Sequence, residues 1–341
     1  MKTIPVEEAV GMVLPHDITE IVRGEKKGPA FRKGHVIRPE DVEHLKRLGK
    51  NHIYVLTLSD DEYHENDAAM LLAKAIAGEN ITYDDQPSEG KVGFKSTISG
   101  LLQVEQEALC RFNMLGEVML ATLHDNTVVT PQKTVAAGRA IPLVIKKDIV
   151  HEAVKIAEDA RGLVKVLPWH IKKAAIVVTG REVYEGRIKD AFCPVMTEKM
   201  QQFGIDVVYQ TLAPDDIDII TREIQTAVSK GAEMVLCTGG MSVDPDDVTR
   251  VAIARAGATD ICYGSPVLPG AMFLVSYLND IPIVGIPACG MFFKITVFDL
   301  VLPRILAGER ITRREIAAMG HGGLCLSCKT CRYPVCPFGK G

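Results

Sequence analysis

The stretch "AAIVVTG" (residues 174–180) decides how this chain folds, because it is an unbroken apolar run that ends in a threonine and a glycine. Two further runs, "IDVVYQTL" (205–212) and "EMVLCTGG" (233–240), follow it with helix-like segments between them. Strands that alternate with helices in this way indicate βαβ units and a doubly wound, mostly parallel sheet. The sequence therefore predicts an α/β fold whose ligands bind beyond the carboxyl ends of the strands.

The segments between these runs have the periodicity of helices. One helix is expected around Pro194 and ends at Gly204. The next, within "PDDIDIITREIQTAVSKG" (214–231), is predicted to begin at a cap formed by Asp215 or Asp216 and to end before Gly231. Its apolar residues form one helical stripe: Ile217, Ile220, Ile224 and Val228.

The whole chain of 341 residues is longer than one ordinary domain. We expect a small N-terminal α+β domain at 1–60, a middle α/β domain of unknown role at 61–170, the sheet domain at 171–310 and a Cys-rich tail at 311–341. In the first two domains the patterns predict helices at 39–48, 68–77, 101–115 and 149–160.

Composition limits the possible partners. A formal net charge of −4 provides no basic surface for nucleic acid or anionic lipid, so neither is expected as a partner. The N-terminus has acidic residues where a signal peptide needs an apolar core, and the longest apolar stretch, 281–293, is too short for a membrane span. We expect a cytoplasmic protein with reduced thiols.

Three loops with ligand-binding chemistry fall at the carboxyl edge of the predicted sheet. They are "TGREVYEGRIKD" (179–190), "TGGMSVDPDD" (238–247), which enters a helix near Pro245, and "GIPACG" (285–290). Glycines allow backbone N–H groups to approach a ligand, and threonine and serine hydroxyls add donors, as a phosphate requires. The candidate binding residues are Thr179, Gly180, Thr238, Gly239, Gly240, Ser242, Gly285 and Pro287.

Acidic residues in the same loops change the expected ligand. Glu182, Asp190, Asp246 and Asp247 would repel a bare phosphate, so they imply a cation such as Mg²⁺ or hydrogen bonds to a polar ring. Together the loops indicate a phosphorylated heterocycle. Each loop alone is also explained as an ordinary turn or N-cap.

Residues 171–310 resemble the molybdopterin-binding domain shared by molybdopterin molybdenumtransferases, molybdopterin adenylyltransferases and competence/damage-inducible proteins. "TGREVYEGRIKD" is similar to the Thr-Gly-x-Glu element of that family, and "TGGMSVDPDDVT" is similar to its Gly-Gly-x-Ser element with a following Asp. The resemblance implies catalytic roles for Glu182, Asp190 and Asp247, with Asp247 near the pterin phosphate and Mg²⁺, and Asp246 as a second Mg²⁺ ligand.

Two other loops depart from the family pattern. Pro269 and Gly270 occupy the place of its Pro-Gly loop and are implied to bind cofactor, but Leu268 and Ala271 flank them where the family has lysines. In the third loop, residues 288–290 replace the family's Gly-Asn-Pro. Loss of a cation weakens the case for handling molybdate or a nucleotide phosphate, so binding could persist without turnover.

The resemblance implies a protein of molybdenum cofactor biosynthesis that binds molybdopterin or its adenylylated form. If the protein is an enzyme, it is a molybdenumtransferase-like transferase that inserts molybdate with release of AMP. The alternatives are a non-catalytic carrier or metal-sensing regulator, and a nucleotide pyrophosphatase. Because relatives of this domain self-associate, a homodimer is expected.

The tail gathers four cysteines as Cys325-x₂-Cys328-x₂-Cys331-x₄-Cys336-Pro. This spacing differs by one residue from the bacterial ferredoxin run. Four thiolates can bind an iron–sulfur cluster or a tetrahedral zinc, and the nearby cations Lys329, Arg332 and Lys340 would offset the charge. An unmetallated thiol tail is the third alternative.

Overall fold

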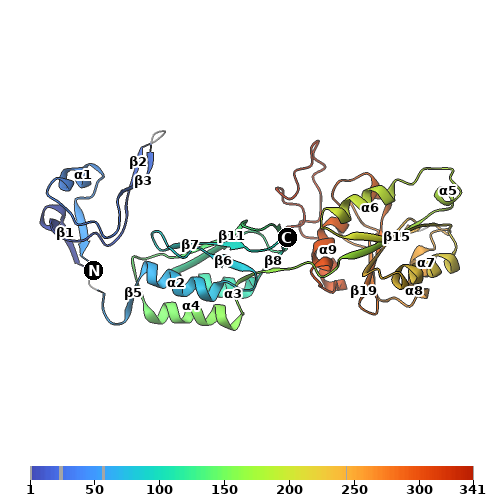
Figure 1. The fold of residues 1–341 in the computed structure, drawn as a ribbon, viewed down its shortest axis with the longest axis horizontal. Helices are drawn as coiled ribbons and strands as arrows, with labels where there is room; N and C mark the ends of the chain where they lie inside the picture. The colour runs from blue at the N-terminus through green and yellow to red at the C-terminus, as the bar shows by residue number, and fades with distance from the viewer. Residues whose placement is uncertain (1, 23–25, 56–57, 243, 341) are drawn as a thin grey trace. The chain divides into compact units, whose positions relative to one another are not determined.

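The computed structural model describes residues 2–22, 26–55, 58–242 and 244–340 (Figure 1). The chain divides into two compact units, Met1–Leu167 and Pro168–Gly341. Among the helices of the described residues, none has the length and apolar character needed to cross a membrane.

The first part of unit one has its own small core, in which Val6, Leu14 and Leu45 are fully buried. Its outer strands pair antiparallel, with Ile4 opposite Ile53. The helix begins at Asp41, within the predicted 39–48 segment. The elements are β1 (Lys2–Pro5), η1 (Val6–Ala9), β2 (Ile18–Val22), β3 (Lys26–Phe31), α1 (Asp41–Arg47) and β4 (His52–Val55).

The rest of unit one packs helices against short antiparallel sheets. A four-stranded sheet has the order β6-β7-β11-β9, a three-stranded sheet has the order β10-β8-β13, and β5 pairs with β12. The helices are α2 (Glu65–Ile76), α3 (Gln106–Met114) and α4 (Lys147–Asp159). The strands are β5 (Glu62–His64), β6 (Ile81–Tyr83), β7 (Lys91–Ser96), β8 (Gly100–Val104), β9 (Val118–Thr122), β10 (Val128–Val129), β11 (Thr134–Ala140), β12 (Val144–Lys146) and β13 (Val164–Leu167).

One helix of this region was predicted too long. Residues 101–104 belong to strand β8, and the helix α3 begins only at Gln106. Strand β8 pairs with β13, with Val104 opposite Val164, and its leucines are fully buried. The pairing partner lies some sixty residues away in the sequence, so a local pattern could not reveal it.

Unit two is built on a six-stranded sheet with the order β15-β14-β16-β19-β18-β17. Strands β15, β14, β16 and β19 are parallel, and β18 runs antiparallel to both β19 and β17. The α/β class is therefore confirmed, with a mixed sheet. The strands are β14 (Lys173–Thr179), β15 (Asp206–Ala213), β16 (Met234–Thr238), β17 (Thr259–Tyr263), β18 (Leu274–Leu278) and β19 (Ile281–Ile286).

Both faces of this sheet are covered, which explains why its central strands are apolar throughout. Ile176 and Val178 of β14 face a core shared with α6 (Phe192–Gln201) and α9 (Val297–Leu306). Val177, with the opposite orientation, faces α7 (Ile217–Ser229) and α8 (Thr249–Arg255) (Figure 1). The predicted cap of α7 is confirmed, because the Asp216 carboxylate accepts a hydrogen bond from the N–H of Ile219 at 2.9 Å.

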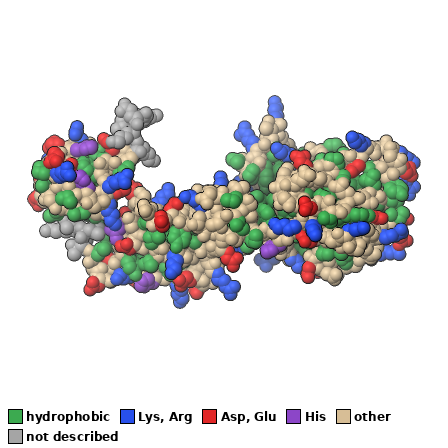
Figure 2. All heavy atoms as spheres, viewed as in Figure 1, with side chains coloured by type: hydrophobic (Ala, Val, Ile, Leu, Met, Phe, Trp, Pro, Cys, Tyr) green, Lys and Arg blue, Asp and Glu red, His purple; other side chains and the backbone are tan. Residues whose placement is uncertain are grey.

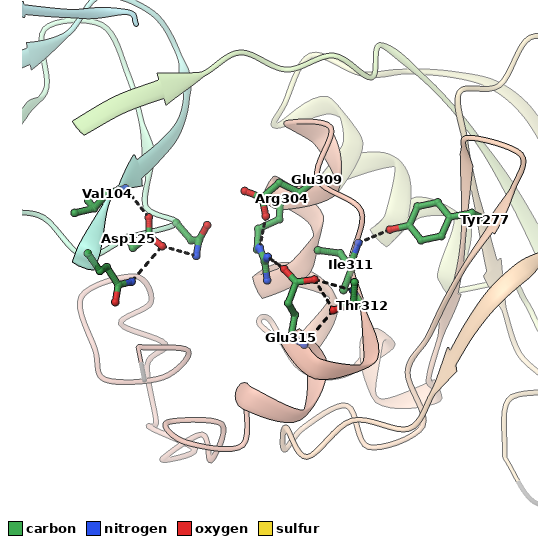
Figure 3. A network of polar contacts seen from close by, with 10 residues as sticks. Val104, Asp125, Tyr277, Arg304, Glu309, Ile311, Thr312 and Glu315 are labelled. Atoms are coloured by element: carbon green, nitrogen blue, oxygen red, sulfur yellow. Dashed lines mark hydrogen bonds and ion pairs between the residues drawn. The ribbon is translucent and has the colours of Figure 1, made fainter. Parts of the chain in front are cut away.

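A polar network fixes the helix α10 (Arg313–Ala318), which precedes the tail (Figure 3). Arg304 of α9 donates to Glu309 at 2.6 Å and forms an ion pair with Glu315 of α10. Thr312 and Glu315 cap the helix reciprocally, and the N–H of Ile311 donates to the Tyr277 hydroxyl at 2.6 Å. The segment that enters the tail is therefore tied to the sheet.

Candidate functional site: the carboxyl edge of the six-stranded sheet

The strand register brings the predicted loops to one edge of the sheet. Thr238 at the end of β16 lies between Val178 of β14 and Ile286 of β19. Leu274 lies between Tyr263 and Gly285, so the loop from β17 to β18, which contains the Pro-Gly pair, leaves at this edge too. Residues separated by more than a hundred positions in the sequence thus meet.

Three threonines connect the first two loops in the interior of this edge. The hydroxyl of Thr179 donates to the carbonyl of Thr238 at 3.0 Å and lies 2.8 Å from the hydroxyl of Thr249. All three side chains are buried. The first loop, the second loop and the start of α8 therefore form one connected structure.

The glycines of the second loop are required by this close contact. A Cβ atom at Gly239 would lie 2.1 Å from the carbonyl oxygen of Thr179, and one at Gly240 would lie 2.3 Å from the hydroxyl of Thr249. Both residues have positive φ angles, +85° and +56°, which glycine adopts without steric cost. No other residue fits here without displacing the first loop.

Donors without partners gather beside these glycines. The hydroxyl of Thr238 is buried and has no hydrogen-bond partner among the described residues. Within the same part of the chain, the backbone N–H groups of Gly240, Met241 and Ser242 have no acceptor either. An unsatisfied buried polar group costs about 1–3 kcal/mol, and successive free N–H groups form anion-binding concavities. The arrangement suits a bound anion.

The acidic residues take different places. Asp190 accepts hydrogen bonds from the N–H groups of Phe192 and Cys193 at 2.8 and 3.2 Å, so its carboxylate holds the start of α6. Glu182 is exposed in the short helix α5 (Arg181–Tyr184). Asp246 is exposed and Asp247 is half-buried, both in the second loop.

The second loop is longer than predicted, because the helix near Pro245 begins only at Thr249. The Asp247 carboxylate accepts from the N–H of Asp244 at 3.2 Å, and the N–H of Asp247 donates to the carbonyl of Asp244 at 3.0 Å. Aspartate that bonds nearby backbone in this way competes with helix formation. Residue 243 of this loop lies outside the described residues.

No three His, Cys, Asp or Glu side chains of the described residues lie close enough to hold a metal ion. Magnesium in phosphate sites commonly takes only one or two carboxylates and completes its shell with phosphate and water. Asp246 and Asp247, on the loop that carries the free N–H groups, fit that requirement.

The remaining predicted residues have packing contacts. Gly285 lies inside β19, where a Cβ would stand 2.5 Å from Cε of Met241. The carbonyl of Pro269 accepts from the N–H of Val297 at 3.1 Å, and a Cβ at Gly270 would lie 2.4 Å from the Val297 side chain. Pro287 is buried and precedes a single 3₁₀ turn, η2 (Ala288–Met291). The first loop's Gly180 also has a positive φ.

Sequence reasoning missed three residues at this edge. Thr249 completes the threonine cluster, and its signal was its place directly after the "DPDDV" of the second loop. Asp215 accepts from the N–H of Arg181 at 2.8 Å. The guanidinium of Arg250 lies 4.5 Å from the centre of the Tyr263 ring, whose hydroxyl donates to the carbonyl of Met241 at 2.7 Å. Arg250 thus places a cation beside the second loop.

With this geometry established, comparison with known proteins identifies the domain. Residues 175–307 match the family described as "Probable molybdopterin binding domain", and residues 3–57 match a domain of unknown function (DUF8806). The resemblance inferred from the loops is confirmed: residues 175–307 form a domain of the molybdopterin-binding family.

The relatives match over this part of the chain only. A CinA-like protein of Fervidobacterium nodosum is 34% identical over 86 residues, which is 25% of this chain and 21% of that protein. Two solved structures are similar: CinA of Thermoplasma acidophilum (15% identity, TM-score 0.36, 40% of this chain and 98% of that chain) and MoaB of Thermus thermophilus (18%, 0.34, 41% and 98%). The chain spans about a fifth of the length of that CinA-like relative.

Proposed function

We propose that the carboxyl edge of the sheet binds molybdopterin, or its adenylylated form, through the phosphate, in molybdenum cofactor biosynthesis. The unpartnered buried hydroxyl of Thr238, beside the free N–H groups of residues 240–242, carries this proposal. A phosphate accepts several hydrogen bonds at once and would satisfy these donors. The family of the domain supports a pterin as the ligand.

Metal ions form the second part of the proposal. Asp246 and Asp247 would hold Mg²⁺ together with the ligand's phosphate, and Mg²⁺ would supply neutralisation of the phosphate charge. Asp190 and Glu182 stay outside that pair, because Asp190 is engaged at the start of α6 and Glu182 lies in α5. The tail cysteines would hold an iron–sulfur cluster or zinc, apart from the pterin.

The protein either releases AMP when molybdate is inserted or only carries the pterin. The surroundings of the Pro-Gly loop favour the carrier. Leu268 and Ala271 flank it, and Lys199, close to the third loop, is engaged by the carbonyl of Lys294 at 2.9 Å and by an ion pair with Asp299. A paired lysine is less available to an oxyanion. A cytoplasmic location and a homodimer stay predictions.

Anaerobic calorimetric titration of the full chain with adenylylated molybdopterin and Mg²⁺ tests the proposal. Saturable binding is expected, and molybdate is then added while AMP is followed. Binding with molybdate-dependent AMP release identifies a transferase, and binding without release identifies a carrier. Absence of binding contradicts the proposal, and release of AMP without molybdate indicates a pyrophosphatase instead.

A further inference from the structure

The four tail cysteines line one cavity of about 390 Å³. Cys325 and Cys336 are half-buried, whereas Cys328 and Cys331 are exposed. The opposite wall is formed by residues 292–295, which connect η2 to α9. The sequence showed only that four thiols are close along the chain. The structure shows that they share one space.

The loop that carries these cysteines is clasped at its base. The N–H of Gly339 donates to the carbonyl of Gly322 at 3.0 Å, which closes the loop on itself. Phe338 is only 3% exposed and packs in the core beneath the sheet. At the other end, the N–H of Cys325 donates to the carbonyl of Leu268 at 2.9 Å. The thiols are therefore held near one another before any ligand binds.

The lining of the cavity is basic as well as sulfur-rich. Lys294, Lys329 and Arg332 contribute to it, and no Asp or Glu of the described residues does. Figure 2 shows Lys and Arg side chains at the tip of the projecting tail loop, as located in Figure 1. Nearby cations stabilise thiolates. The site suits a group bound by several thiolates with a net negative charge.

The size of the cavity distinguishes the possible ligands. Zinc holds four sulfurs at about 2.3 Å and leaves no space between them. Here the thiols surround a volume equal to roughly thirteen waters at about 30 Å³ each, and no three of the chain's described Cys, His, Asp or Glu side chains approach closely enough for one ion. A polynuclear group, which spaces its ligands more widely, fits this geometry.

We propose that Cys325, Cys328, Cys331 and Cys336 bind one iron–sulfur cluster in this cavity. Each thiol would lose its proton and bind one iron of a cluster supplied already assembled, so no electron is transferred in the binding step. The proposal does not depend on pterin binding. Because Leu268 and residues 292–295 contact the loop or line its cavity, a bound cluster would also brace the Pro-Gly and third loops.

The test is anaerobic reconstitution of the full chain with ferrous iron and sulfide, with zinc supplied in a parallel sample. We expect about four irons and about four sulfides per chain, with the visible absorption of a cluster. Cys328→Ser and Cys331→Ser, at exposed positions, should each lose at least half of the iron. Cys110→Ser is the matched control, because Cys110 is exposed in unit one.

Two results would overturn the proposal. One is zinc retained at about one per chain while iron and sulfide wash away, which would identify a zinc site. The other is equal iron content in the wild type, Cys331→Ser and Cys110→Ser, which would identify nonspecific iron. Circular dichroism of each variant shows that lost iron does not result from unfolding.

Discussion

The edge of the six-stranded sheet and the cysteine loop belong to one unit, but they are organised in opposite ways. At the sheet edge, Thr179, Thr238 and Thr249 are buried, and two glycines leave no room for a side chain. In the tail, exposed and half-buried thiols surround an open cavity. The sheet edge presents fixed donors to a ligand, whereas the tail needs its ligand to complete the structure. The difference predicts distinct responses to chemical modification and mutation.

Thiol reactivity should show the largest contrast. Burial raises the pKa of Cys237, in β16, to about 12 from a usual value of 9.0, so its thiolate fraction falls about a thousandfold. In metal-free, reduced protein, iodoacetamide should modify Cys328 and Cys331 at least a thousand times faster than Cys237. Peptide mass spectrometry measures the rates, with exposed Cys110 as the reference. Comparable rates at Cys237 would mean that the sheet opens readily.

Gly239→Ala tests the close packing of the sheet edge. Its Cβ would lie 2.1 Å from the Thr179 carbonyl, at a φ of +85°, so we expect a loss of about 2–4 kcal/mol in stability and at least a hundredfold loss in pterin affinity. Gly28→Ala is the control, since a Cβ there meets no atom within 4 Å. Urea unfolding and calorimetry measure both effects. Similar values for the two variants would break the comparison.

Thr238→Val should have smaller effects of opposite sign. Removal of an unpartnered buried hydroxyl should stabilise the free protein by about 1 kcal/mol. The same change should weaken pterin binding about tenfold, because one bond to phosphate is lost. In Thr221→Val, whose hydroxyl donates to the Ala252 carbonyl at 3.2 Å, stability should fall and affinity should stay constant. A destabilised Thr238→Val with unchanged affinity would remove this hydroxyl from the site.

The strands and glycines of the sheet edge could be predicted because their signals are local. An apolar run that ends in glycine, such as residues 174–180, reads as a buried strand and a turn without knowledge of the rest of the chain. The Asp216 cap is equally local. These features are determined by residues within one helical turn or one strand.

Features that depend on distant contacts could not be predicted. Strand β8 is stabilised by β13, and the late start of α8 follows from the turn of Asp244 and Asp247. Gly285 is needed in β19 because Met241 packs over it. The shared cavity of the cysteines likewise depends on residues 292–295, thirty positions before the tail. Only the folded chain brings these groups together.

The requirement for phosphate tests the central claim most directly. Anaerobic calorimetry of the full chain with Mg²⁺ would compare molybdopterin with the same pterin after removal of its phosphate. If the donors around Thr238 and residues 240–242 hold the phosphate, affinity should fall at least a hundredfold without it. Equal affinity for the two ligands would contradict a phosphate site at this edge.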